Sequence, residues 1–378
     1  MQFSRKIFGI VGLKYISLLV ILFLVACKND LNIKAPYKEI PSVYAIITPQ
    51  ESMQMIRINK VFLGDGDANE MAKVADSVNY QAGELTVKLE RFVNGTKVAA
   101  EKVGGKTEVL FRDSLIQTEP GAFSTTQRVY ICNDRLFSDG LYKLTISNNN
   151  TGNVFTATTT AIDSVPLTGL PPFAPPYYPV PYSPSNTPSY YIDYSNVATS
   201  NPYVIRTKAV NGGFIHDLTL RLHYYDSIGG LGKQDQYLDY VFPPQQLNEQ
   251  VSFNNTLYFN FTFRASNLFL EYGNMLSKRT NPSGFVGRRA YKMDYICYAT
   301  TQDYYDYLQF AAPSLTFAQD KLLYSNFDNK AALGLFTFRS RCLISKELWS
   351  TFVDEFAVNK YTCQYQFYTF NLTKPGCQ

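Results

Sequence analysis

Short runs in which apolar and polar residues alternate dominate the chain after residue 43. Leu85, Val87 and Leu89 alternate with polar neighbours, which is the pattern of a strand with one buried face. Asn94-Gly95 follows, and this pair favours the two positive-φ positions of a tight hairpin. A second hairpin is expected over residues 141–160. Such strands, separated by turns about every 8–12 positions, predict a β-sandwich.

The second half of the chain repeats the β pattern and adds short helices. Leu218, Leu220 and Leu222 alternate with Thr219, Arg221 and His223. Alternation also predicts a strand over residues 361–367. Helical spacing predicts helices over residues 68–74, 266–276, 302–310 and 346–356.

A proline-rich segment, residues 166–188, holds nine of the 19 prolines. Proline cannot donate a hydrogen bond within a sheet, so this segment is expected to be a linker between domains. Its aromatic residues either pack on the adjoining domains or serve as a ligand for a partner. The predicted fold is mainly β, with two β-sandwich-like domains and a few short helices. The expected parts are a signal peptide (1–26), a tether (27–41), an Ig-like sandwich (42–165), the linker, and a β-rich domain (189–378).

The N-terminus has the order of features found in a secretory signal. Arg5, Lys6 and Lys14 precede an apolar run from Ile16 to Ala26 that is too short to span a bilayer. The run ends in Leu24-Val25-Ala26-Cys27, which resembles the lipobox of bacterial lipoproteins. The resemblance implies that Cys27 carries palmitate-type acyl chains and becomes the first residue of the mature protein. The alternatives are an ordinary signal with a chance cysteine, or an uncleaved anchor.

The residues after Cys27 bear on the side of the membrane that the protein faces. Lys28-Asn29-Asp30 resembles the surface-export signal of Bacteroidota lipoproteins, with one acidic residue where two are usual. The expected location is therefore the outer membrane, with surface-exposed and periplasm-facing positions both open.

Composition excludes several classes of protein. The chain is 46% hydrophobic and 15% aromatic but only 17% charged, unlike a disordered chain. Its formal net charge is +4, and this falls to +1 once the three basic residues of the signal are removed. No basic run or stripe is present, so nucleic acid is not an expected partner.

Five cysteines remain besides Cys27. Cys363 and Cys377 lie 14 residues apart near the C-terminus and are the candidate disulfide in an oxidising envelope. The alternative is that Cys132, Cys297 and Cys363 are small buried hydrophobic residues, and for Cys132 and Cys297 this is the interpretation that we favour.

A polar loop offers one candidate metal site. Asp65, Asp67 and Asn69 have the 1, 3, 5 spacing of a calcium loop, and Asp76 stands at position 12. Glu70 occupies the position that usually needs glycine, which argues against calcium. The alternative is a turn that leads into a helix.

No catalytic motif is found in the sequence. It contains no G-x-S-x-G, H-E-x-x-H, Walker or G-x-G-x-x-G pattern. The two histidines, His216 and His223, are seven residues apart, so on one strand they would lie on opposite faces. We therefore expect no cofactor and no enzymatic activity.

Three segments of the chain carry a wider resemblance. They are Tyr44–Asn79, with Arg57-Ile58-Asn59-Lys60-Val61-Phe62-Leu63-Gly64; Leu220-Arg221-Leu222-His223-Tyr224; and Tyr324-Ser325-Asn326 followed by Leu333-Gly334-Leu335-Phe336 and Arg339.

With the lipobox, these segments resemble uncharacterised β-rich lipoproteins of Bacteroidota. Such proteins are often encoded near TonB-dependent outer-membrane receptors, which implies a receptor as partner. The expected function is that of a non-catalytic binding or assembly accessory. The alternatives are an envelope hydrolase acting on glycans or peptides, and a surface adhesin or structural protein. Gly334 is expected to allow a bulge or a close backbone approach.

Overall fold

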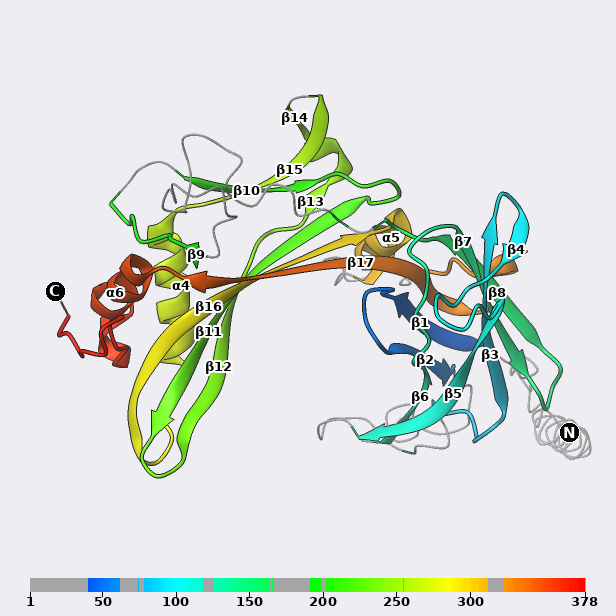
Figure 1. Cartoon of the computed structure of the whole chain (residues 1–378). Coiled ribbons are helices and arrows are strands. Elements are labelled where there is room, and N and C mark those ends of the chain that lie inside the picture. The colour runs from blue at the N-terminus through cyan, green and yellow to red at the C-terminus, as the bar shows by residue number, and fades with distance from the viewer. Residues whose placement is uncertain are drawn as a thin grey trace, which may run out of the picture. The chain divides into compact units, whose positions relative to one another are not determined.

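The computed structural model describes residues 40–61, 74, 78–117, 126–163, 165, 191–198, 202–253, 255–311 and 323–377. The fold is mainly β with few helices, as the sequence predicts (Figure 1). Residues Ile40–Gln378 form one compact unit. The linker over residues 166–188 and most of the helix expected over residues 68–74 lie outside the described residues, and the predicted domain boundaries stay predictions.

In the described part of the first half of the chain there are eight strands. Their alternating side chains supply one hydrophobic core, which includes Val43, Ile56, Val87 and Leu144. Asn94 and Gly95 both have positive φ, and Val93 pairs with Thr96 across them, which confirms the predicted hairpin. The strands are β1 (Pro41–Ile47), β2 (Gln54–Lys60), β3 (Leu85–Val93), β4 (Thr96–Val98), β5 (Glu108–Gln117), β6 (Thr126–Cys132), β7 (Leu141–Asn148) and β8 (Val154–Thr160).

The later strands of the described chain include three that are much longer than the others, with 14 residues in one and 16 in each of the other two. The predicted hairpin over residues 141–160 is confirmed as β7–β8. The second half of the chain adds further strands. They are β9 (Tyr191–Ile192), β10 (Tyr203–Lys208), β11 (Ile215–Ile228), β12 (Gly232–Val241), β13 (Gln245–Gln246), β14 (Val251–Phe253), β15 (Thr256–Phe263), β16 (Phe285–Thr300) and β17 (Leu333–Leu348).

One sheet runs through both halves of the described chain, in the order β12-β11-β16-β17-β1-β2-β6-β5-β3-β7-β8. Strand β17 makes this continuity possible because its first residues pair with β1 in parallel and its later residues pair with β16 antiparallel (Figure 1). Phe336 and Phe338, at the start of β17, pack into the core formed by β1–β8. The first core is therefore completed by residues that lie almost 300 positions later in the chain than β1.

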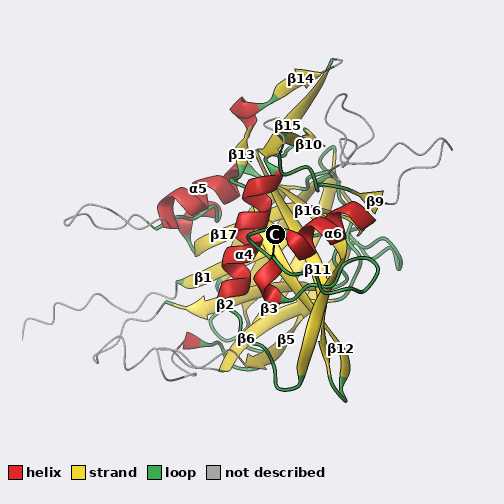
Figure 2. Cartoon of the chain, turned by 90° about the vertical axis from the view of Figure 1, so that its left-hand side faces the viewer, coloured by secondary structure: helices red, strands yellow, loops and turns green. Residues whose placement is uncertain are grey.

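A second core lies on one face of β11, β12 and β16. Leu218, Leu220 and Leu222 point into it from β11, as their alternation predicts. Helices α4 (Ala265–Ser277) and α6 (Ser350–Val358) and the strands β10 and β15 of a small separate sheet contribute further residues to this core (Figure 2). The predicted helix over residues 266–276 is confirmed as α4, and the one over residues 302–310 is confirmed as α5 (Gln302–Ala311).

Two element predictions near the C-terminus are corrected, one in its starting residue and one in its type. The predicted helix over residues 346–356 starts later, at Ser350, because β17 continues to Leu348. The predicted strand over residues 361–367 is mostly turn and 3₁₀ structure, with η3 at Cys363–Tyr365 and a left-handed Gln366 behind it. Two other 3₁₀ turns are η1 (Leu247–Glu249) and η2 (Asp328–Lys330).

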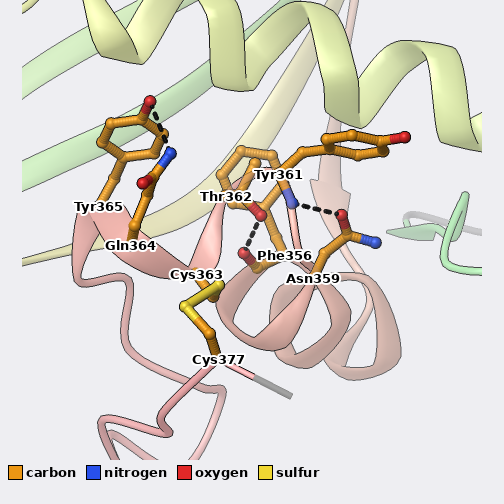
Figure 3. Close-up of a disulfide and its surroundings, with 8 residues drawn as sticks. All are labelled: Phe356, Asn359, Tyr361, Thr362, Cys363, Gln364, Tyr365 and Cys377. Atoms are coloured by element: carbon orange, nitrogen blue, oxygen red, sulfur yellow. Dashed lines mark hydrogen bonds between the residues drawn. A yellow bond between two sulfur atoms is a disulfide. The ribbon is translucent and has the colours of Figure 1, made fainter.

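A disulfide joins Cys363 to Cys377, the pair favoured by the sequence, beside the end of α6 (Figure 3). The Thr362 hydroxyl donates to the Phe356 carbonyl oxygen (2.5 Å), and the Asn359 side-chain oxygen accepts from the Tyr361 amide (3.1 Å). These two bonds hold the turn against the C-terminal end of α6. Cys132 and Cys297 are buried free thiols, as the sequence favours. Among the described residues, no helix is long and apolar enough to cross a membrane.

Candidate functional site

An aromatic groove of about 410 Å³ lies between β1, the start of β17 and α5. Tyr44 reaches it from β1, Tyr307 and Phe310 from α5, and Tyr324 from the segment before β17. We call this feature the aromatic groove. Its lining is completed by Ser42, Val43, Val61, Leu323, Leu333 and Gly334.

The close approach of β1 and β17 beside the aromatic groove depends on Gly334. Gly334 has φ of +107° and pairs with Val43 across the parallel strands. A Cβ atom at this position would lie 2.0 Å from the Val43 carbonyl oxygen. Only glycine allows the backbones to approach so closely, and the expected close approach is therefore confirmed.

Hydrogen bonds from the Tyr-Ser-Asn segment hold Tyr324 beside the groove. The Tyr324 carbonyl oxygen accepts from the Gly334 amide (2.8 Å). The Asn326 side chain both donates to the Phe336 carbonyl oxygen (2.7 Å) and accepts from the Phe336 amide (2.9 Å), as a neighbouring strand would. Ser325 donates to the Ala332 carbonyl oxygen (2.5 Å). These bonds fix the segment against β17 without making it a long strand.

The aromatic rings form a continuous chain along the groove. Ring centroids lie 5.8 Å apart for Tyr44 and Tyr307, 5.9 Å for Tyr307 and Tyr324, and 5.8 Å for Phe310 and Tyr324. These separations are typical of favourable ring contacts. Tyr44 and Phe310 still keep 42% of their surface exposed. The rings therefore brace each other while leaving apolar surface open to a ligand.

The groove carries hydroxyl groups but no net charge from its phenols. Burial raises the pKa of Tyr324, and the neighbouring Asp303 carboxylate, which accepts from the Tyr324 hydroxyl (3.0 Å), raises it further. Burial and the nearby Tyr304 and Tyr307 raise the pKa of Tyr44. Both phenols are neutral at physiological pH. Tyr44 can donate a hydrogen bond to a ligand, whereas Tyr324, which donates to Asp303, can accept one.

The face of β11 opposite the second core carries a separate polar cluster. His223 Nε2 lies 2.7 Å from Asp294 Oδ2, and Ser345 Oγ donates to Asp294 Oδ1 (2.6 Å). Although burial raises the pKa of Asp294, hydrogen bonds from Ser345 and His223 hold it below the usual value. Arg221 binds Asp239 with two hydrogen bonds of 2.7 Å on the same face.

This polar cluster does not have the order of a nucleophile, a base and an orienting acid. In that arrangement the serine hydroxyl bonds to the histidine and the histidine bonds to the acid. Here Ser345 and His223 both bond to Asp294, so His223 does not activate Ser345. The geometry is that of a carboxylate held by its neighbours.

The second histidine lies on the other face, as its spacing predicts. His216 is fully buried on β11 and stacks on Phe259 with 4.0 Å between ring centroids. Burial lowers the pKa of His216 to about 4, so the ring is neutral at physiological pH. Its Nδ1 lies 3.3 Å from the Thr207 hydroxyl. His216 is thus a core residue and cannot share a ligand with His223.

The predicted lipid-anchor residue and the predicted calcium ligands lie outside the described residues. They are Cys27 and the loop residues Asp65, Asp67, Asn69 and Asp76. Within the part of the chain that the structure describes, no three His, Cys, Asp or Glu side chains are grouped as metal ligands.

The sequence pattern does not predict the groove residues as a site, although some of them lie in segments that it singles out. Tyr44, Tyr324 and Gly334 belong to two of the segments that carry the family resemblance.

No family model matches the chain, and no curated protein matches it either.

Proposed function

We propose that the chain is a lipid-anchored protein of the outer membrane that acts as a non-catalytic binding or assembly accessory, and that it docks a partner protein in the aromatic groove. One observation carries the proposal: the rings of Tyr44, Tyr307, Tyr324 and Phe310 contact one another in a row, and those of Tyr44 and Phe310 remain partly exposed to solvent. The partner implied by the family resemblance is a TonB-dependent receptor.

The chemistry of the groove suits a protein partner with an apolar anchor. Tyrosine is enriched among the residues that contribute most to protein interfaces, since it buries a large area with little loss of conformational freedom. Burying apolar surface contributes about 25 cal/mol per Å². The Tyr44 and Tyr324 hydroxyls add hydrogen bonds that select the orientation of the partner.

Photo-crosslinking from inside the groove tests this proposal. A photoreactive phenylalanine analogue at position 307 should cross-link to one discrete envelope protein in intact cells, and mass spectrometry should identify it as a TonB-dependent receptor. The same analogue at Leu110 is the control, because Leu110 is 63% exposed and belongs to β5, away from the groove lining. Equal products from both positions, or none from position 307, would contradict docking in the groove.

Truncation of the aromatic wall should weaken the complex. Tyr44→Ala is expected to cost about 2 kcal/mol of binding free energy, as for a central interface tyrosine. The measurement is the yield of receptor that co-purifies from detergent-solubilised membranes, with Leu110→Ala as the matched control. An unchanged yield with Tyr44→Ala, in a protein that unfolds at the wild-type temperature, would rule out this wall as the contact.

A further inference from the structure

A second cavity, of about 470 Å³, lies among β11, β12, β16 and the end of α4. Unlike the aromatic groove, it is lined almost entirely by charged and amide side chains. Among the described residues that line it, the cationic members are Lys278, Arg279 and Arg288, and the single carboxylate is that of Asp226. We call this feature the cationic cavity.

Arg288 forms the buried wall of the cationic cavity. Its side chain is almost completely buried, and its residue is only 1% exposed. Its Nε donates to Asp226 (2.8 Å), one Nη to Asn281 (2.9 Å) and the other to the Tyr365 carbonyl oxygen (3.3 Å). A guanidinium group has five N–H donors, so these three bonds leave two N–H groups without a described acceptor.

The C-terminal turn helps to keep Arg288 in place. The Arg288 amide donates to the Gln366 carbonyl oxygen (3.0 Å), and the Arg288 carbonyl oxygen accepts from the Tyr368 amide (2.7 Å). The disulfide that starts at Cys363 closes this turn (Figure 3). The covalent link therefore supports the backbone that carries the buried cation.

Arg279 forms the solvent-exposed side of the cationic cavity, and its position is fixed by neutral partners. It donates to the Tyr224 hydroxyl (2.7 Å), the Gln236 side-chain oxygen (3.1 Å) and the Tyr237 carbonyl oxygen (2.6 Å). None of these acceptors carries a negative charge. The full positive charge of Arg279 thus remains uncompensated by its hydrogen-bond partners.

The charges around the cavity do not balance. Asp226 compensates Arg288, with which it forms the ion pair. Lys278 and Arg279 then leave an excess of two positive charges among the lining residues that the structure describes. Gln234 and Thr280 add neutral groups that can donate and accept hydrogen bonds. Positive charge beside neutral hydrogen-bonding groups is the lining that an oxyanion on a hydroxyl-bearing molecule requires.

We infer that the cationic cavity binds a small hydroxyl-rich molecule through its carboxylate or phosphate group, with Arg279 and Lys278 contacting the oxyanion. A sugar acid and a sugar phosphate share this chemistry. This ligand site is separate from the aromatic groove and does not depend on the proposed protein partner.

Calorimetric titration with three related sugars tests the site. The purified protein should bind glucuronate or glucose 6-phosphate and should not bind glucose, which has the same ring without the anion. Whichever of glucuronate and glucose 6-phosphate binds more tightly shows whether the site prefers a carboxylate or a phosphate group. Because a charge-assisted hydrogen bond contributes about 1.5–3 kcal/mol, Arg279→Met should weaken binding roughly tenfold or more.

Two further variants separate ligand binding from a purely structural role. Lys278→Gln should also weaken binding of the anion, whereas Lys233→Gln, which removes an exposed cation on β12 outside the cavity lining, should leave it unchanged. A role limited to favourable charge at the C-terminal end of α4 would lower the unfolding temperature of Lys278→Gln and Arg279→Met without changing binding. That result, equal binding of glucose, or no saturable binding of either anion would overturn the inference.

Discussion

Gly334→Ala is expected to lower the free energy of unfolding by at least about 3 kcal/mol, because strain in the left-handed region and a main-chain clash add together. The φ of +107° is one that residues with a Cβ atom avoid. The new methyl group would also meet the Val43 carbonyl oxygen at 2.0 Å, and that oxygen belongs to rigid backbone that cannot move aside as a side chain would. Urea denaturation measures the loss.

Gly83→Ala is the matched control for this substitution. Gly83 also has a positive φ, of +70°, but a Cβ atom there would meet nothing within 4 Å. It should therefore show only the cost of left-handed backbone, about 1–2 kcal/mol. If both substitutions destabilise the protein equally, the close approach of β1 and β17 does not limit stability.

The consequence of Gly334→Ala should extend to the aromatic groove. Val43 and Gly334 pair at the point where β1 brings Tyr44 to the groove, and the Gly334 amide also holds the carbonyl oxygen of Tyr324, which reaches the groove from the segment before β17. A variant that separates these strands should therefore lose partner cross-linking from position 307 together with stability. Loss of stability with undiminished cross-linking would show that the groove forms without this strand pair.

Local pattern was enough to predict individual elements in this chain. Asn94-Gly95 specifies a hairpin because two positive-φ positions occur together, and the spacing of Leu268, Tyr272 and Leu276 specifies the buried face of α4. The strand period of two also places His216 and His223 on opposite faces of β11. In each case the determining interactions lie within a few residues of one another.

The pairing of β1 with β17 could not be predicted, because alternation shows which face of a strand is buried but not which strand lies beside it. The aromatic groove depends on that pairing. Tyr44 is far in the sequence from Tyr307 and Tyr324, and each of the three on its own is consistent with a core or a surface position. The cationic cavity was missed for the same reason, since Asp226, Arg279 and Arg288 meet only after β11, α4 and β16 have packed.

The wrong strand over residues 361–367 has a local cause that alternation does not reveal. Gln366 adopts φ of +60°, which ends any extended run. The disulfide between Cys363 and Cys377 and the bond from Thr362 to the Phe356 carbonyl oxygen hold the segment as a turn against α6. Phe367 packs on Phe356 of α6 and makes a single isolated bridge to Arg288, so the segment does not continue as a strand.

Cys27→Ala is expected to abolish palmitate labelling and to remove the mature protein from the outer membrane. The proposed anchor consists of two or three acyl chains on one residue, and each buried CH₂ group contributes about 0.8 kcal/mol to membrane binding. No other membrane anchor is proposed for the mature chain. The variant should therefore be found as unprocessed precursor or as soluble protein, which radiolabelled palmitate and membrane fractionation would measure.

Cys342→Ala is the control that separates lipidation from general loss of a thiol. Cys342 is a half-buried cysteine in β17 that takes no part in the Cys363–Cys377 disulfide, so its replacement should leave labelling and fractionation at wild-type levels. Cys27→Ala must also keep the fold, because Cys27 lies outside the compact unit Ile40–Gln378. An unchanged unfolding temperature of the soluble variant would show that its release comes from the missing lipid. Undiminished palmitate labelling in Cys27→Ala would instead reject the anchor, and with it the proposed placement of the protein at the outer membrane.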